Sequence, residues 1–196
     1  MSSKEENSWM LKSFFSMIST QYNSTVKILR SNNGSEFINS SVHDFFHFEG
    51  VIHQTTCVYT PQQNGVVKRR HRYILEIARA LRFEAAIPIT FWGDCVLIVV
   101  HLINRIPSSF LENKSPYEIY FKTPFYLDHL KFFGCLAYAV SVDRKDKFVA
   151  RGLPVVFLGY SATQRGYKLY DLHAKRVLFS RDVIFHESVF PFKPMS

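Results

Sequence analysis

The hydrophobic pattern of the sequence changes near residue 130. Before this point, apolar residues recur at helical spacing, and two short apolar runs at residues 25–31 and 51–57 interrupt them. After it, short apolar or alternating runs follow one another closely, at residues 132–140, 155–160, 167–172, 176–180 and 183–185. Strands that alternate with helices predict an α/β unit, whereas closely spaced strands predict a small barrel or meander. We therefore expect two domains, at residues 1–125 and 126–192.

Helices in the first part are predicted from periodicity and from end signals. They are expected at residues 5–22, 35–48 and 66–83, at a segment that begins with Pro88 and stops before Pro107, and at a short helix capped by Ser115. Gly50 marks the end of the second helix. The third helix is expected to bury one side, formed by Val67, Ile74, Ile77, Ala78 and Leu81.

Composition limits the classes of function. Apolar residues make up 47% of the 196 residues, which is enough for a sizeable core. Three widely spaced cysteines argue against a disulfide scaffold or a zinc knuckle and favour a reducing compartment. The sequence shows no apolar run long enough for a membrane span and no secretory signal, so we expect an intracellular protein, nuclear or cytoplasmic, with no membrane partner.

Positive charge is concentrated on the third predicted helix. The net charge of +8 indicates a polyanionic partner, most often nucleic acid. Between residues 68 and 82 there are six Lys or Arg residues and one acid, Glu76. The predicted nucleic-acid contacts are Gln62, Asn64, Lys68, Arg69, Arg70, Arg72 and Arg79. The alternative is a solvated basic helix surface that contacts no nucleic acid.

Two other patterns resemble chemical sites. His43 and His47 have the spacing of metal ligands on a helix, but no third ligand is evident, so ordinary surface or half-buried histidines are favoured. His53 and Cys57 lie close together in sequence, yet nothing indicates the geometry of a nucleophile and its base.

Several stretches together point to a known family. They are LRSNNGSEF, IHQTTCVYTPQQNGVVKRRHR, FWGDCV, SPYEIYF, LKFFGCLAYA and FLGYSATQRGYKLYDL. In this order they resemble the integrase region of copia-type long-terminal-repeat retrotransposon polyproteins, from about residue 10 to about residue 192. The resemblance implies a ribonuclease-H-like catalytic core followed by an SH3-like barrel.

The family's catalytic core uses two Asp residues and one Glu to hold two magnesium ions, and the last two carboxylates lie 35 residues apart. In this sequence Asn32 stands at the position of the second Asp and Lys68 at that of the Glu, with 35 residues between them. The first Asp lies on an earlier strand, which we expect this chain to lack. The resemblance therefore implies that no catalytic position is intact and that no Mg²⁺ cofactor is held.

The resemblance also predicts an incomplete sheet. A ribonuclease-H-like sheet has five strands, and only the last two are expected here, near residues 26–31 and 51–56. The fold class is therefore α/β, a partial ribonuclease-H-like core that lacks its first strands, followed by a small all-β SH3-like barrel. Aromatic side chains that would cover the missing strands are expected to be partly exposed: Trp9, Phe14, Phe15, Phe45 and Phe46.

The sequence thus predicts an integrase-derived segment that binds nucleic acid and has no catalytic activity. One alternative is an interaction module that associates with itself or with an intact integrase. Another is a non-functional relic whose product folds poorly.

Overall fold

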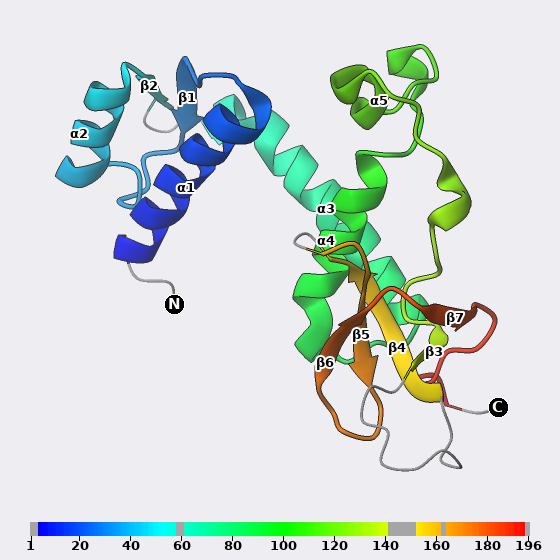
Figure 1. Cartoon of the computed structure of the whole chain (residues 1–196). Coiled ribbons are helices and arrows are strands. Elements are labelled where there is room, and N and C mark those ends of the chain that lie inside the picture. The colour runs from blue at the N-terminus through cyan, green and yellow to red at the C-terminus, as the bar shows by residue number, and fades with distance from the viewer. Residues whose placement is uncertain (1–3, 58–60, 141–151, 162–163, 195–196) are drawn as a thin grey trace. The chain divides into compact units, whose positions relative to one another are not determined.

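The computed structural model describes residues 4–57, 61–140, 152–161 and 164–194, with side chains from residue 7 onward and, after the first gap, from residue 63 (Figure 1). It divides into two compact units, residues 1–70 and 71–196, and the division falls inside one long helix. The predicted domain boundary at residue 125 remains a prediction.

The first unit is built on two short parallel strands. Helix α1 (Lys4–Tyr22) precedes strand β1 (Ile28–Ser31), and helix α2 (Ser40–Glu49) connects it to strand β2 (Ile52–Thr55). The strands pair in parallel, with Ile28 opposite Ile52. Parallel strands need a crossover connection, and α2 provides it. Both predicted strands are confirmed, but each is shortened to the four residues that pair with its neighbour.

Helix α2 begins later than predicted. The side chain of Asn39 accepts a hydrogen bond from Val42 N at 3.0 Å and caps the helix, so residues 35–37 form a turn instead of a first helical turn. The predicted end at Gly50 is confirmed, because this residue adopts the left-handed conformation with φ of 67°.

A small aromatic cluster forms the core of the first unit. Phe15, Val42, Phe46 and Val51 are buried together, and the ring of Phe15 meets that of Phe45 edge-on at 5.2 Å. The prediction of partial exposure is wrong for Phe15 and Phe46, which are only 8% and 3% exposed, because the two helices pack these rings against each other. It is confirmed for Trp9 and Phe14, which are 69% and 45% exposed.

A series of helices follows β2. The 3₁₀ turn η1 (Pro61–Asn64) leads into helix α3 (Gly65–Glu84), and the 3₁₀ turn η2 (Ile89–Phe91) leads into helix α4 (Trp92–Ile103). The segment then continues through η3 (Ser109–Leu111), α5 (Pro116–Phe121) and η4 (Leu127–His129). The predicted cap at Ser115 is confirmed as a capping box with Glu118.

The second unit ends in a curled antiparallel sheet. Within the described residues, its five strands are β3 (Leu136–Val140), β4 (Gly152–Tyr160), β5 (Tyr167–Asp171), β6 (Val177–Ser180) and β7 (Val183–His186). Their order is β6-β5-β4-β3-β7, so two strands that are consecutive in the chain occupy opposite edges. A link of two residues cannot cross a flat sheet of this width, roughly 19 Å at the usual strand spacing. The sheet must therefore curl toward a barrel.

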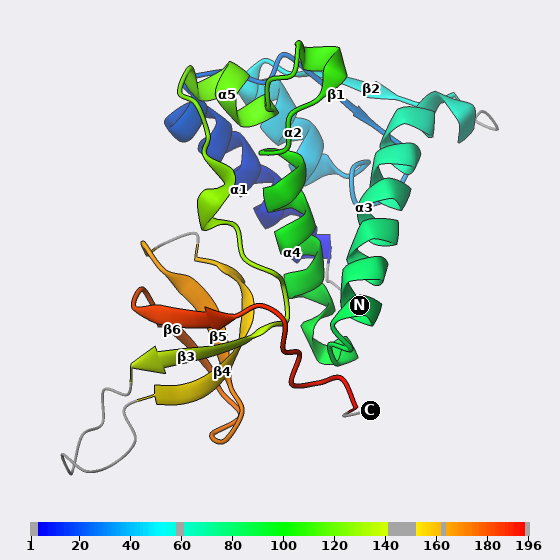
Figure 2. The same ribbon diagram turned by 90° about the vertical axis from the view of Figure 1, so that its right-hand side faces the viewer.

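Strand β4 is buried on both faces. Val155 and Phe157 point into the curled sheet, whereas Val156 and Leu158 pack against Ile98 and Val99 of α4. Figures 1 and 2 show the sheet lying against this helix. Double burial explains why this strand is a continuous apolar run instead of an alternating one.

A partly buried ion pair also ties α4 to the sheet. Lys168 Nζ of β5 lies 2.5 Å from the Asp94 carboxylate of α4. Among the described residues, no helix is both long and apolar enough to cross a membrane.

Candidate nucleic-acid interface

A polar cleft lies at the carboxyl ends of β1 and β2. It has a volume of about 540 Å³, and its walls come from both strand ends and from the turn before α3. Its lining residues are Arg30, Ser31, Gln54, Thr55, Thr56, Cys57, Gln63 and Asn64. Gln63 Oε1 accepts a hydrogen bond from Cys57 N at 2.9 Å, which links the end of β2 to the start of the helix. Asn32 follows one wall of the cleft in the chain, and α3 with Lys68 follows the other, but neither residue lines it.

Asn32 and Asn33 both serve the turn after β1. Asn33 Nδ2 donates to the carbonyl of Thr56 at 3.0 Å and ties the turn to the neighbouring strand. Asn32 is exposed, and its Oδ1 accepts a hydrogen bond from Gly34 N at 3.3 Å. The amide oxygen of Asn32 thus already takes part in a local turn.

The residues at this cleft do not fit a magnesium site. None of the lining side chains is a carboxylate, and the cleft carries the guanidinium of Arg30. Magnesium ions in such sites are held by carboxylates, which offset their charge. In the part of the chain that the structure describes, no group of three His, Cys, Asp or Glu residues could hold a metal ion. This includes the histidine pair on α2, where His43 and His47 are exposed and His43 lies 3.7 Å from Asp44.

His53 pairs with Ser31, not with Cys57. Ser31 Oγ lies 2.8 Å from His53 Nε2 and also donates to the carbonyl of Asn32 at 2.9 Å. Burial lowers the pKa of His53, with a smaller contribution from His43, so the ring stays neutral near pH 7. Ser31 is only 6% exposed, and this arrangement fixes the two strand ends to each other instead of presenting a nucleophile. Sequence analysis missed this pair because only the register of the parallel strands brings it together.

The predicted basic residues are exposed along α3. Lys68, Arg69, Arg70, Arg72 and Arg79 are all exposed. At helical spacing, positions 68, 72 and 79 share one face. These three residues form what we call the basic face, and the one acid between residues 68 and 82, Glu76, is also exposed.

The other side of α3 differs from the prediction at one position. Ala78 is buried, and Ile74, Ile77 and Leu81 pack against the core as predicted. Val67, however, is 66% exposed. It lies in the first turns of the helix, before the segment that α4 covers.

The predicted polar contacts before α3 lie in the 3₁₀ turn. Asn64 is half-buried and lines the polar cleft, so this residue and the basic face are contiguous in the chain. The side chain of Gln62 lies outside the described residues, as do Tyr59 and Thr60 of the predicted loop.

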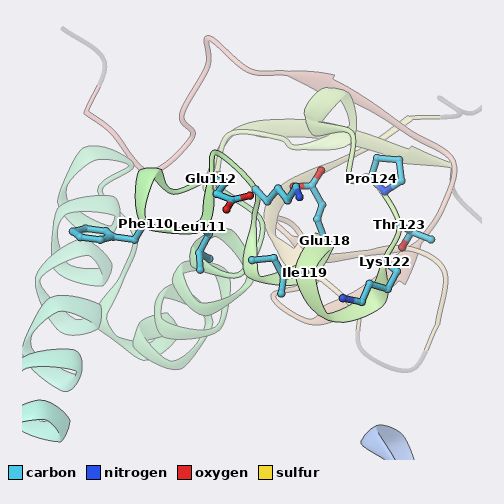
Figure 3. Close-up of a pocket in the computed structure, with 9 residues that line it drawn as sticks. Phe110, Leu111, Glu112, Glu118, Ile119, Lys122, Thr123 and Pro124 are labelled. Atoms are coloured by element: carbon cyan, nitrogen blue, oxygen red, sulfur yellow. The ribbon is translucent and has the colours of Figure 1, made fainter.

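A second hollow lies beside α5 in the second unit. It has a volume of about 640 Å³ and is bordered by Glu112, Glu118, Lys122 and Pro124, while Phe110 points away from them (Figure 3). Glu118 already has hydrogen-bond partners within the fold, because its carboxylate accepts hydrogen bonds from Ser115 N at 2.7 Å and Phe125 N at 3.2 Å. These backbone hydrogen bonds lower the pKa of Glu118. The hollow has mixed charge, and Glu118 serves the local fold there.

Comparisons with known proteins agree with this architecture. Residues 135–196 match the family described as the retroviral polymerase SH3-like domain. The chain is 34% identical over 189 residues to the retrovirus-related Pol polyprotein from transposon TNT 1-94 of Nicotiana tabacum, which covers 96% of this chain and 14% of that protein. It is also 34% identical over 180 residues to the Pol polyprotein from transposon RE1 of Arabidopsis thaliana, covering 91% of this chain and 12% of that protein. The chain thus spans a small part of these curated relatives.

Solved structures give more distant likenesses. The catalytic core domain of BIV integrase is 20% identical, with a TM-score of 0.45, over 62% of this chain and 73% of that chain. A simian T-cell lymphotropic virus intasome, solved in complex with the PP2A regulatory subunit B56 gamma, is 13% identical with a TM-score of 0.47, over 94% of this chain and 65% of that chain.

The chain is similar to a segment of retrotransposon Pol polyproteins and carries a retroviral polymerase SH3-like domain. It belongs to the retrovirus-related Pol polyproteins of copia-type transposons. The predicted family is confirmed, as are the α/β character of the first part and the SH3-like domain that follows it. The ribonuclease-H-like description of the first part stays a prediction.

Proposed function

We propose that this segment binds nucleic acid through the basic face of α3 and does not catalyse strand transfer. The observation that carries the proposal is the row of five exposed cations on one helix, at positions 68, 69, 70, 72 and 79. Exposed cations on a helix can contact the regularly spaced charges of a phosphate backbone. Such contacts position a protein on nucleic acid but do not read its sequence.

The loss of catalysis is argued from the two substituted ligand positions. Asn32 offers a neutral amide oxygen, and Lys68 brings an ammonium group to the place of a carboxylate. Two unit charges of like sign repel by about 4 kcal/mol at 4 Å and an effective dielectric constant near 20, and a divalent ion doubles this. Lys68 therefore opposes metal binding and at the same time favours a phosphate.

Binding is tested by fluorescence anisotropy with a labelled duplex over a range of salt concentrations. The variant K68A/R72A removes two cations from the basic face. The matched control K27A/K122A removes two exposed cations that lie outside α3. Each lost phosphate contact is expected to reduce the slope of log K against log salt by about 0.9, so the first variant should lose about 2 units of slope.

The control variant should keep the slope of the wild type. An equal reduction of the salt slope in both variants would show that only net charge matters. A wild-type affinity that does not change with salt concentration would overturn the proposal. Strand-transfer assays with magnesium or manganese are expected to give no product.

Thermal unfolding separates a folded binding segment from a relic. A ligand that binds the native state raises the midpoint temperature by mass action. We expect a cooperative transition that moves upward when the duplex is added at modest salt. A broad transition that the duplex leaves unmoved would support the relic instead.

Self-association is a second candidate function. Trp9 and Met10 of α1 are 69% and 57% exposed, and Phe14 is 45% exposed on the same helix. Exposed apolar side chains in one region are typical of interaction surfaces. Light scattering after size exclusion, with the chain alone and with the chain mixed with an intact relative, would detect such complexes.

We also propose an intracellular location, nuclear or cytoplasmic, which imaging of a tagged chain would test.

A further inference from the structure

A narrow apolar groove runs between α3 and α4 in the second unit. Its volume is about 180 Å³, and Leu75, Ala78 and Val96 contribute to its walls. The two helices lie side by side in both views of the chain (Figures 1 and 2). The groove has the size of a site for one anchoring side chain, not of a site for a large ligand.

Large apolar side chains border the groove and remain in contact with solvent. Trp92 is 60% exposed, Ile89 is 62% exposed and Phe83 is 65% exposed. Exposed aromatic side chains around a concave apolar surface are characteristic of places where a protein partner seats an anchor residue. The basic face, in contrast, consists of polar and charged side chains.

Two arginines give the groove a positive charge. Arg79 and Arg82 both line it, and none of the lining residues is an acid. Arg82 Nε is buried and makes no hydrogen bond within the described residues. Nearby Glu84 is already paired with Lys193 at 2.7 Å. Burial also raises the pKa of the Cys95 thiol, so this lining residue stays neutral at physiological pH.

We propose that this groove binds an acidic amphipathic helix of another protein. One aliphatic or aromatic side chain of that helix would enter the space between Leu75, Ala78 and Val96. A neighbouring carboxylate would pair with the guanidinium groups of Arg79 and Arg82 that line the groove, and Trp92 would cover the anchor. Helices with apolar anchors at regular spacing commonly bind in grooves of this kind.

The apolar walls favour a peptide over nucleic acid at this place. A phosphate backbone needs polar partners along its length, and here only Arg79 and Arg82 provide them. A peptide that carries both a carboxylate and an apolar side chain satisfies the charge and the apolar walls together. The groove is separate from the cleft, although it shares Arg79 with the basic face, and the proposal does not depend on nucleic-acid binding.

The probe is a labelled amphipathic helical peptide of about 15 residues, with leucines on one face and glutamates beside them. A second peptide has glutamine in place of every glutamate. Affinity is measured by anisotropy with the full chain. In parallel, the Arg82 Nε–H and Trp92 indole N–H signals are followed by NMR. We expect the acidic peptide to bind at least about tenfold more tightly than its glutamine counterpart and to shift both signals.

Two variants test the residues. R82K keeps the charge but removes the planar guanidinium, which can hold a carboxylate with two hydrogen bonds, and we expect about tenfold weaker binding of the acidic peptide. W92A removes the side chain that would cover the anchor residue and should weaken the binding of both peptides. The control R181A changes an exposed arginine outside the groove and should leave the affinity unchanged.

Equal binding of the two peptides, or an R82K variant that binds as well as the wild type, would overturn the proposal. A DNA duplex that shifts the Arg82 Nε–H signal while the acidic peptide does not would also overturn it. That result would assign the groove to the nucleic-acid surface.

Discussion

The pH dependence of stability is expected to depend on one histidine of α4. The ring of His101 stacks on Tyr160 of β4 at 4.2 Å, and its Nε2 is buried without a hydrogen bond among the described residues. Burial lowers the pKa of His101 to about 4, and the charges of Arg105 and His129 act in the same direction. The folded state therefore holds this ring neutral, whereas the unfolded chain protonates it near its ordinary pKa of 6.5.

The sign of the effect follows from proton binding. Between these two pKa values the unfolded state binds more protons, so the free energy of unfolding falls as the pH falls. The contribution of His101 is fully present above its unfolded pKa and is lost as the pH falls toward about 4. From about pH 7.5 to about pH 5 the full shift corresponds to about 2 kcal/mol, and partial exposure of the ring reduces this to about 1 kcal/mol.

Urea unfolding of the full chain at these two pH values measures the effect. The variant H101F keeps an aromatic ring against Tyr160 but cannot be protonated. We expect it to lose about 1 kcal/mol of the pH dependence. The control H173N changes an exposed histidine of the same unit and should behave as the wild type. If H101F kept the whole pH dependence of the wild type, the reasoning would be wrong.

Two further predictions concern a glycine and the substituted ligand positions. Gly134 has φ of 81°, and an added Cβ would lie 2.4 Å from the Cβ of Ala85. Backbone strain and overpacking should therefore lower the free energy of unfolding of G134A by about 2–5 kcal/mol, as measured by urea unfolding. Gly50 has φ of 67° but nothing within 4 Å, so G50A should cost only about 1–2 kcal/mol, and equal costs would contradict this account. The double variant N32D/K68E should gain binding of Mn²⁺ in titration calorimetry, because it restores two carboxylates and removes a cation. Binding of Mn²⁺ by the wild type with the same affinity would refute the argument that these positions lost the metal.

The sequence determined the features that depend on near neighbours in the chain. Helical and alternating periodicities located the helices and all the described strands, because each pattern repeats within a few residues. Ser115 and Gly50 marked helix ends through local hydrogen bonding and backbone conformation. The spacing between Asn32 and Lys68 was also visible in the sequence, as was the cluster of cations that follows.

The tertiary structure decided which surfaces are covered and which side chains meet. Only the parallel register brings Ser31 to His53, since those residues are 22 positions apart. Only packing shows that Val67 is exposed while Arg82 is half-buried, although both lie on the same helix. Periodicity shows that a face is apolar, but the element that covers it comes from a distant part of the chain. For this reason the groove beside Arg82 could be found only once α4 was placed against α3.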